Sequence, residues 1–300
     1  MTKKNQNNQG FTLVELMVAM AISLVVMGAI FLTFKSQQDS YVIQEQVSAM
    51  QQNLRAAMYM LTRDIQMAGY YTNFDGNQYT MDWDDLDGTN ETIRPLIYAR
   101  NNVADGGGDN IKDNTDVITI VKASSKTRPL ADPESATGSS VADALRNVDN
   151  LKAGKCALLV KANLSRAEFF QVQEDSGDMS LTITLVENYK ENDSIYRADV
   201  IVYYVDDEDD PGDATDNDDP ANPKLLRKNL GSNQSAQVVA ENIDNLQFRY
   251  LLNSGPPLID NPSGSEPNVR AVEISIQAIT DNGQKTRTLT SLVKTRNIGL

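Results

Sequence analysis

The sequence predicts an α+β protein in which a long N-terminal helix is followed by a body rich in β-strands. Segment 11–34 is apolar along its length, and residues 47–68 repeat apolar side chains at helical spacing. From residue 116 onward, apolar and polar side chains alternate as they do in strands. No proline occurs before Pro95, so the two helical patterns can join into one helix, for which Gly69 is a natural C-cap.

The first half of the predicted helix, segment 11–34, is long enough to cross a membrane once, because about 20 apolar residues span the hydrocarbon core. Glu15 is its only charged residue. A carboxylate inside a membrane costs about 2.5–3.5 kcal/mol on insertion scales, so Glu15 is expected to have a partner. Cleavage after Gly10 would create an α-amino group on Phe11, four residues before Glu15 on the same helix face. The alternative partner is the amine of a neighbouring subunit.

The second half of the predicted helix, residues 35–69, is amphipathic. Its polar side chains, which include Glu45, Arg55 and Asp64, fall between the apolar ones. Arg63 and Asp64 are interpreted as solvated charges of the last turn. The apolar stripe that should pack on the globular body consists of Val47, Met50, Leu54, Ala57, Leu61, Ile65 and Ala68.

The body is predicted to consist of strands, with a central strand at 116–122 that is apolar on both faces. Residues 70–115 are expected to be irregular, and residues 124–150 are expected to form a loop with a short helix near 141–145. The pair Asn282-Gly283 predicts a tight hairpin turn before the last strand. The other predicted strands are 155–161, 169–173, 181–185, 200–205, 246–250, 272–278 and 286–294.

Composition excludes several classes of function. The net charge is −14, and it would become −16 on loss of Lys3 and Lys4, so no nucleic-acid partner is expected. The chain has no histidine, which excludes Ser-His and Cys-His catalysis and histidine-ligated metals. Its single cysteine, Cys156, lies in an apolar run and is predicted to be a buried core residue. The chain is therefore not expected to be an enzyme.

The most acidic segment is 206–219, where nine of fourteen residues are Asp or Glu. Asp206, Glu208, Asp210 and Asp213 are candidate ligands for calcium, which prefers carboxylate oxygens, although no cofactor is otherwise expected. The order of residues departs from the EF-hand pattern, so a solvated acidic hairpin tip is the alternative.

Near the C-terminus, four basic residues form a predicted edge whose charge is opposite to that of the acidic segment. It is interpreted as protection of an edge strand, with contact to an anion as the alternative. The residues are Lys285, Arg287, Lys294 and Arg296.

At the N-terminus, the run Gly10-Phe11-Thr12-Leu13-Val14-Glu15 follows a short leader with two lysines and precedes the apolar segment. It resembles the processing site of type IV pilin precursors. The resemblance implies that a prepilin peptidase cuts between Gly10 and Phe11 and N-methylates Phe11, and that Glu15 neutralises the amine of an adjacent subunit during assembly. An ordinary secretory signal has a shorter apolar core, and a plain signal anchor does not explain Glu15.

Five further segments resemble PilW-type minor pilins: 61–70, 155–160, 241–250, 269–272 and 294–297. The resemblance implies a pilin-like fold, with the helix packed on an enlarged antiparallel sheet. It implies a single-pass protein of the inner membrane, with the leader cytoplasmic and the C-terminal domain periplasmic, that joins a pilus and promotes the start of assembly. The implied partners are other minor and major pilins and a tip adhesin.

The expected domains are a cleaved leader at 1–10, a membrane or filament-core helix at 11–34, an amphipathic helix at 35–69, and a globular domain at 70–300 that carries the acidic loop 206–219. Two alternatives to the minor pilin share this organisation. One is a pseudopilin of a type II secretion system. The other is a binding or adhesion module that uses calcium at the acidic loop.

Overall fold

The computed structural model divides the chain into two compact units, Met1–Ala49 and Met50–Leu300. The residues whose structure is described are 11–70, 79–80, 92–93, 97–103, 111–129, 136–137, 140–141, 154–163, 167–172, 179–180, 185, 188–190, 192–206, 223–232, 235–262, 265, 268–280, 283 and 285–296.

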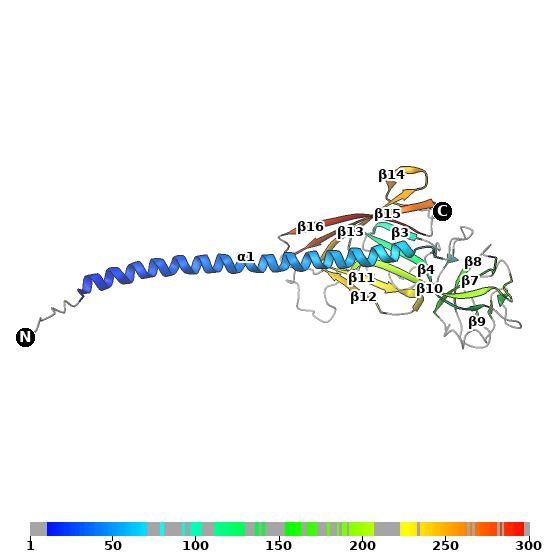
Figure 1. Ribbon diagram of the computed structural model, residues 1–300, viewed down its shortest axis with the longest axis horizontal. Helices are drawn as coiled ribbons and strands as arrows, with labels where there is room; N and C mark the ends of the chain where they lie inside the picture. The colour runs from blue at the N-terminus through cyan, green and yellow to red at the C-terminus, as the bar shows by residue number, and fades with distance from the viewer. Residues whose placement is uncertain are drawn as a thin grey trace, which may run out of the picture. The chain divides into compact units, whose positions relative to one another are not determined.

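Helix α1 (Leu13–Met67) contains both halves of the predicted helix and is the most N-terminal element (Figure 1). In the first unit its side chains are exposed from Phe11 through Val42. In the second unit its predicted stripe is buried on the body, which confirms the amphipathic pattern: Met50, Leu54, Ala57, Leu61, Ile65 and the following Ala68 are at most 4% exposed. Val47, just outside this unit, is half-buried.

Within the described residues, the largest sheet has seven strands and is antiparallel. The predicted strand 116–122 is central, as expected, because β4 pairs with β3 on one side and with β10 on the other. β7 and β8 continue the sheet beside the first residues of β10. The strands are β3 (Ile97–Val103), β4 (Thr115–Pro129), β7 (Cys156–Val160), β8 (Ala167–Gln171), β10 (Ser194–Asp206), β11 (Lys224–Asn229) and β12 (Gln237–Glu241).

A second antiparallel sheet of four strands has the order β14-β13-β15-β16 in the described part of the chain. Its bounds are β13 (Ile243–Leu252), β14 (Gly255–Ile259), β15 (Val269–Ile279) and β16 (Thr286–Lys294). The predicted last hairpin is β15 with β16, and Gly283 between them has a φ of 69°, which glycine adopts readily. Shorter strands are β1 (Tyr79–Thr80), β2 (Thr92–Ile93), β5 (Ala136–Thr137), β6 (Ser140–Val141) and β9 (Met179–Ser180).

The two sheets are joined by polar contacts around Asp116, which is 1% exposed. Its carboxylate accepts hydrogen bonds from the backbone N–H of Asn102 in β3 at 2.8 Å and of Phe248 in β13 at 2.6 Å. Lys112 Nζ also contacts Asp244 Oδ1 at 2.7 Å. The Asp116 carboxylate at the start of β4 therefore binds a backbone donor of β13, and Lys112 before β4 binds a carboxylate side chain of the same strand.

The seven-stranded sheet is buried on both faces, which explains why β4 and β10 read as apolar runs. One face contributes residues such as Val121, Cys156, Val200 and Val202 to a core that also holds Leu230 of the short 3₁₀ helix η1 (Leu230–Ser232). Ile118, Ile120, Ile201 and Tyr203 belong to the opposite side of the same strands, and Tyr203 contacts the end of α1. Cys156 is a buried free cysteine, as predicted.

Two predictions of irregular structure were wrong. Residues 70–115 contain β3, a seven-residue strand that pairs with β4, and the predicted loop at 124–150 begins inside β4, which runs to Pro129. In both segments polar side chains interrupt the apolar pattern that is typical of a strand. These residues form strands because they pair with a central strand of the sheet. The strands β11, β12 and β14 were not predicted either. Of the predicted strand 181–185, only Leu185 is among the described residues. Of the short helix predicted near 141–145, only Val141 is among them.

Candidate functional site

The start of α1 forms a reciprocal capping arrangement between Thr12 and Glu15. Glu15 Oε2 accepts hydrogen bonds from the backbone N–H of Thr12 at 2.9 Å and from Thr12 Oγ1 at 3.0 Å. Thr12 Oγ1 in turn accepts one from the backbone N–H of Glu15 at 3.3 Å. This is a capping box, in which an N-cap Thr and a Glu three residues later satisfy each other's backbone donors. The carboxylate therefore has partners at the N-terminus of its own helix.

The predicted partner of Glu15 was the amine of Phe11 or of a neighbouring subunit. In the uncleaved chain the Phe11 nitrogen belongs to the peptide bond with Gly10, and Gly10 lies outside the described residues. The cleavage site and the amine contact therefore remain predictions. Sequence reasoning missed the role of Thr12, although the pattern Thr-x-x-Glu before an apolar run is a recognised helix-start signal.

The apolar segment that follows is exposed throughout. Phe11 is 90% exposed, and the large apolar side chains from Leu13 to Phe34 are between 50% and 76% exposed. By length and composition, α1 is the described helix that could cross a membrane. Segment 11–34 is uncharged except for Glu15, so it presents lipid or other helices with an almost wholly apolar surface.

The other end of α1 is held by a buried charge cluster centred on Asp64. Its carboxylate contacts Lys122 Nζ of β4 at 2.8 Å and Arg227 Nε of β11 at 2.9 Å, and it accepts a hydrogen bond from the Tyr203 hydroxyl of β10 at 2.7 Å. Asp64 is 4% exposed, so the prediction of a solvated charge there was wrong, whereas Arg63 is exposed as predicted. Position 64 lies three residues after Leu61, on the apolar stripe, which was the available signal.

Electrostatics explain why Asp64 stays ionised in this setting. Burial alone would raise the pKa of Asp64, but hydrogen bonds from Lys122 and Tyr203 and the charges of Lys122 and Arg227 lower it further, so the net pKa lies below the ordinary value. The same contacts raise the pKa of Arg227, against the effect of its own burial. Burial and the adjacent Asp64 charge together raise the pKa of Tyr203. The cluster is therefore a carboxylate bound by two cations and a neutral phenol.

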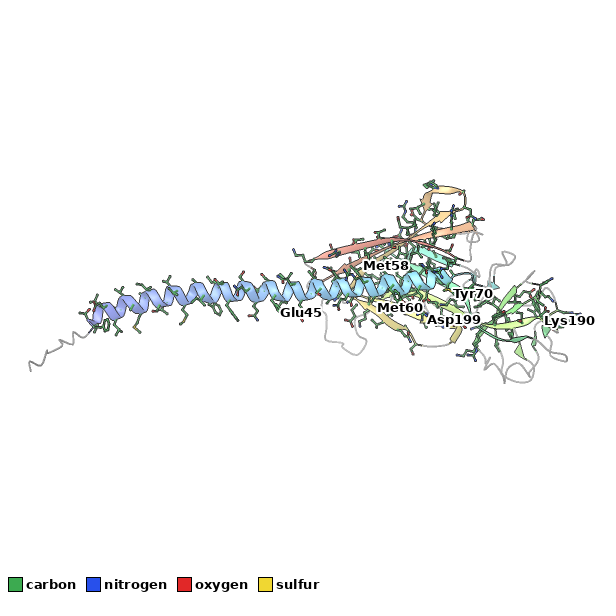
Figure 2. The ribbon with its side chains drawn as sticks, in the orientation of Figure 1. Glu45, Met58, Met60, Tyr70, Lys190 and Asp199 are labelled. Atoms are coloured by element: carbon green, nitrogen blue, oxygen red, sulfur yellow. The ribbon has the colours of Figure 1, made fainter. Side chains whose placement is uncertain are left out.

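Just beyond α1, the chain forms a corner that is bonded to β4. Gly69 has a φ of 73°, and its N–H donates to the Val121 carbonyl at 3.0 Å. The Tyr70 carbonyl then accepts from the N–H of Ala123 at 3.0 Å, and Tyr70 itself lies at the end of the helix (Figure 2). These two bonds continue along β4 past the first residue of β3, which pairs with Ile120. The corner therefore fixes the helix end with backbone contacts as well as charges.

The acidic segment gives no metal site that the structure describes. Asp206 ends β10, while Glu208, Asp210 and Asp213 lie outside the described residues, so the calcium prediction is untested. Within the described part of the chain, no group of three or more His, Cys, Asp or Glu residues is placed to hold a metal ion. At the basic edge, Lys285, Arg287, Lys294 and Arg296 are all exposed on or beside the edge strand β16.

Comparison with known proteins supports the reading of the N-terminus. The family model described as "Prokaryotic N-terminal methylation motif" matches residues 5–31, a segment that contains Gly10, Phe11 and Glu15. No curated protein and no solved structure matches the chain. The motif implies processing by a prepilin peptidase and contact with other pilins. The N-terminal segment of the chain is therefore similar to that of type IV pilin-like precursors, and the long apolar helix packed on antiparallel sheets is consistent with a pilin-like fold.

Proposed function

We propose that the chain is a minor pilin of the PilW type, a structural subunit that promotes the start of type IV pilus assembly. In this proposal it is inserted once in the inner membrane with its leader in the cytoplasm, and a prepilin peptidase cuts between Gly10 and Phe11 and methylates the new amine. The observation that carries the proposal is the methylation motif, which includes the capped start of a helix whose apolar side chains are exposed. The segments that resemble PilW-type sequences support the finer assignment.

The proposed mechanism gives Glu15 two successive sets of partners. Before assembly, the Thr12 N–H and hydroxyl hold the carboxylate, which lessens its cost within the bilayer. During assembly, helix 11–34 leaves lipid for a bundle of similar helices, and the amine of a neighbouring subunit binds Glu15. Because a charge-assisted hydrogen bond between an amine and a carboxylate requires a short distance and a defined direction, this contact sets the axial register of the subunit. Retention of Glu15 supports a position below the topmost subunit, which has no neighbour above it.

The decisive experiment is mass spectrometry of the N-terminus in sheared surface filaments and, separately, in the cell envelope. A peptide that begins with N-methylated Phe11 in the filaments is the expected result. An intact Met1 leader, in cells whose processing machinery is active, would refute the proposed processing.

A second function, a pseudopilin of a type II secretion system, is favoured by the same motif and differs in location. Its expected signature is methylated Phe11 in the envelope and none in surface filaments. The filament fraction therefore distinguishes the two proposals.

The role of Glu15 is tested by Glu15→Ala, with Glu45→Ala as the matched control. Glu45 is an exposed carboxylate on the same helix, outside the apolar segment (Figure 2). Glu15→Ala is expected to leave cleavage intact and to reduce the amount of processed protein in filaments, whereas Glu45→Ala should behave as the parent. Equal incorporation of all three chains would show that Glu15 has no assembly contact.

A further inference from the structure

The edge strand β16 stands out because its charges are of one sign. Residues 285–296 contain four basic and no acidic residues, in a chain whose net charge is −14. All four basic side chains are exposed, and among the described residues none of them forms an ion pair. Arg270, beside the end of β16, adds a fifth exposed cation, since Thr295 donates its N–H to the Arg270 carbonyl at 3.1 Å.

The same strand has an open side. β16 pairs with β15 over nine residues, and it is the last strand of its sheet in the described part of the chain. Every second residue of such an edge strand directs its backbone N–H and C=O away from the sheet. The side chains of β16 are exposed apart from Leu289 and Ser291, which are half-buried, and Val293, which is buried; Leu292 is 53% exposed. Within the part of the chain that the structure describes, backbone groups without a strand partner and cations without an ion pair therefore share one edge.

The chain also contains a segment of matching opposite charge. Nine of the fourteen residues in 206–219 are acidic, and none is basic. The cations from Lys285 to Arg296 are distributed over about 35 Å of extended chain. Fourteen residues reach at most about 50 Å, so one acidic segment is long enough to run past all four cations.

We propose that β16 is a docking edge for residues 207–219 of a second copy of this chain, the part of the acidic segment that follows β10. Carboxylates of one copy pair with the cations of Arg287, Lys294 and their neighbours on the other, beside the free backbone groups of the strand. Opposite charges across paired strands are stabilising, and the four cations lack ion pairs within their own described chain. The proposal does not depend on the proposed pilus function, because two copies would pair in this way whether or not they enter a filament.

The test measures self-association of the full chain in neutral detergent micelles by sedimentation velocity over a concentration series. One variant removes three edge cations: Arg287→Gln, Lys294→Gln and Arg296→Gln. Its matched control removes two exposed arginines and one exposed lysine elsewhere: Arg55→Gln, Arg63→Gln and Lys190→Gln. Lys190 lies at the opposite end of the second unit from β16 (Figure 2).

Exposed ion pairs contribute about 1.4-fold to 5-fold each to an equilibrium, so loss of three is expected to weaken association about tenfold. The control should stay within about twofold of the parent. Neutralising Asp207, Glu208, Asp209 and Asp210 should weaken association to a similar degree, and combining this change with the edge variant should add little. Thermal melts establish that each variant folds, which is expected because every substituted edge side chain is exposed.

Three outcomes would overturn the proposal. The first is no concentration-dependent association in 50 mM salt, where exposed charges are least screened. The second is equal weakening by the edge variant and its control, which would indicate general charge effects. The third is association that loses nothing when the acidic segment is neutralised, which would assign the contact to the apolar helices or to another acidic surface.

Discussion

Substitution Asp64→Asn should separate the two readings of the end of α1, because a solvated charge and a buried one differ greatly in energy. The carboxylate is 4% exposed, and its two cationic partners, Lys122 and Arg227, are 14% and 19% exposed along their side chains. Removing one member of a buried ion pair costs about 3–5 kcal/mol, mainly because the remaining charge is left unpaired. Both cations retain some access to water here, so we expect a loss of about 2–4 kcal/mol in the free energy of unfolding.

A loss of this size is readily measured. Domains are stable by about 5–15 kcal/mol, and a body of this size loses about 2–4 °C in Tm for each kcal/mol. We therefore expect Asp64→Asn to lower the Tm of the globular unit by about 5–15 °C in thermal unfolding followed by circular dichroism. Arg63→Gln is the matched control, since Arg63 is the adjacent charge on the same turn and is exposed. It should change the stability by no more than about 0.5 kcal/mol.

A double-mutant cycle of Asp64→Asn with Lys122→Gln gives the sharper refutation. If the two side chains act as one cluster, the combined loss should be smaller than the sum of the single losses by more than about 1 kcal/mol. Additive losses, or an Asp64→Asn chain as stable as Arg63→Gln, would show that the contacts at 2.7–2.9 Å contribute nothing to stability.

Two further predictions concern the glycines and the buried Asp116. Gly231→Ala should destabilise the body by about 1–3 kcal/mol in denaturant unfolding, because the new Cβ would lie 2.5 Å from the backbone oxygen of Ala198. Gly28→Ala is the control. Its new Cβ would have no atom within 4 Å, so it should not destabilise the body. Burial, and secondarily the charge of Asp260, raises the pKa of Asp116, so the folded state binds this proton more tightly than the unfolded one. The parent should gain stability relative to Asp116→Asn as the pH falls from 7 through the raised pKa, with no further gain below about pH 4; a Tm difference that is constant with pH would contradict this.

The helix and the last sheet were predictable because their signals are strong and local. A run of seven apolar residues at helical spacing has few alternative structures, and six of them are buried as expected. In the hairpin, β15 alternates apolar and polar side chains, and the sequence Asn-Gly that follows it predicts a turn, so the second strand was predicted with the correct bounds. In both cases the local sequence pattern favours the same structure that the segment adopts in the whole fold.

The strands that were missed depend on distant partners. β3 contains Arg100 and two asparagines, and Asn102 takes a φ of 47° within it. The carboxylate of Asp116 in the neighbouring strand accepts a hydrogen bond from the Asn102 N–H and so stabilises this irregular position of β3. The same limit applies to Asp64. Its place on the apolar stripe is visible in the sequence, whereas the two cations that make burial tolerable are 58 and 163 residues away.

The magnitudes in the N-terminal segment limit what Glu15 can do. Sixteen large apolar side chains between Phe11 and Phe34 are exposed, and burying each is worth about 1.5–3 kcal/mol, or about 25–50 kcal/mol together. Against this, the insertion cost of one carboxylate, about 3 kcal/mol, is small, so Glu15 does not decide whether the segment enters lipid. Transfer from lipid to a helix bundle is different. Acyl chains are as apolar as leucine, so the free energy of burying the apolar side chains is nearly the same in lipid and in the bundle. A charge pair of a few kcal/mol then becomes one of the main differences between alternative positions in the bundle. The role that we propose for Glu15 is therefore selection of the axial register rather than anchoring, and Glu15→Ala should change filament incorporation while membrane insertion stays at the level of the parent.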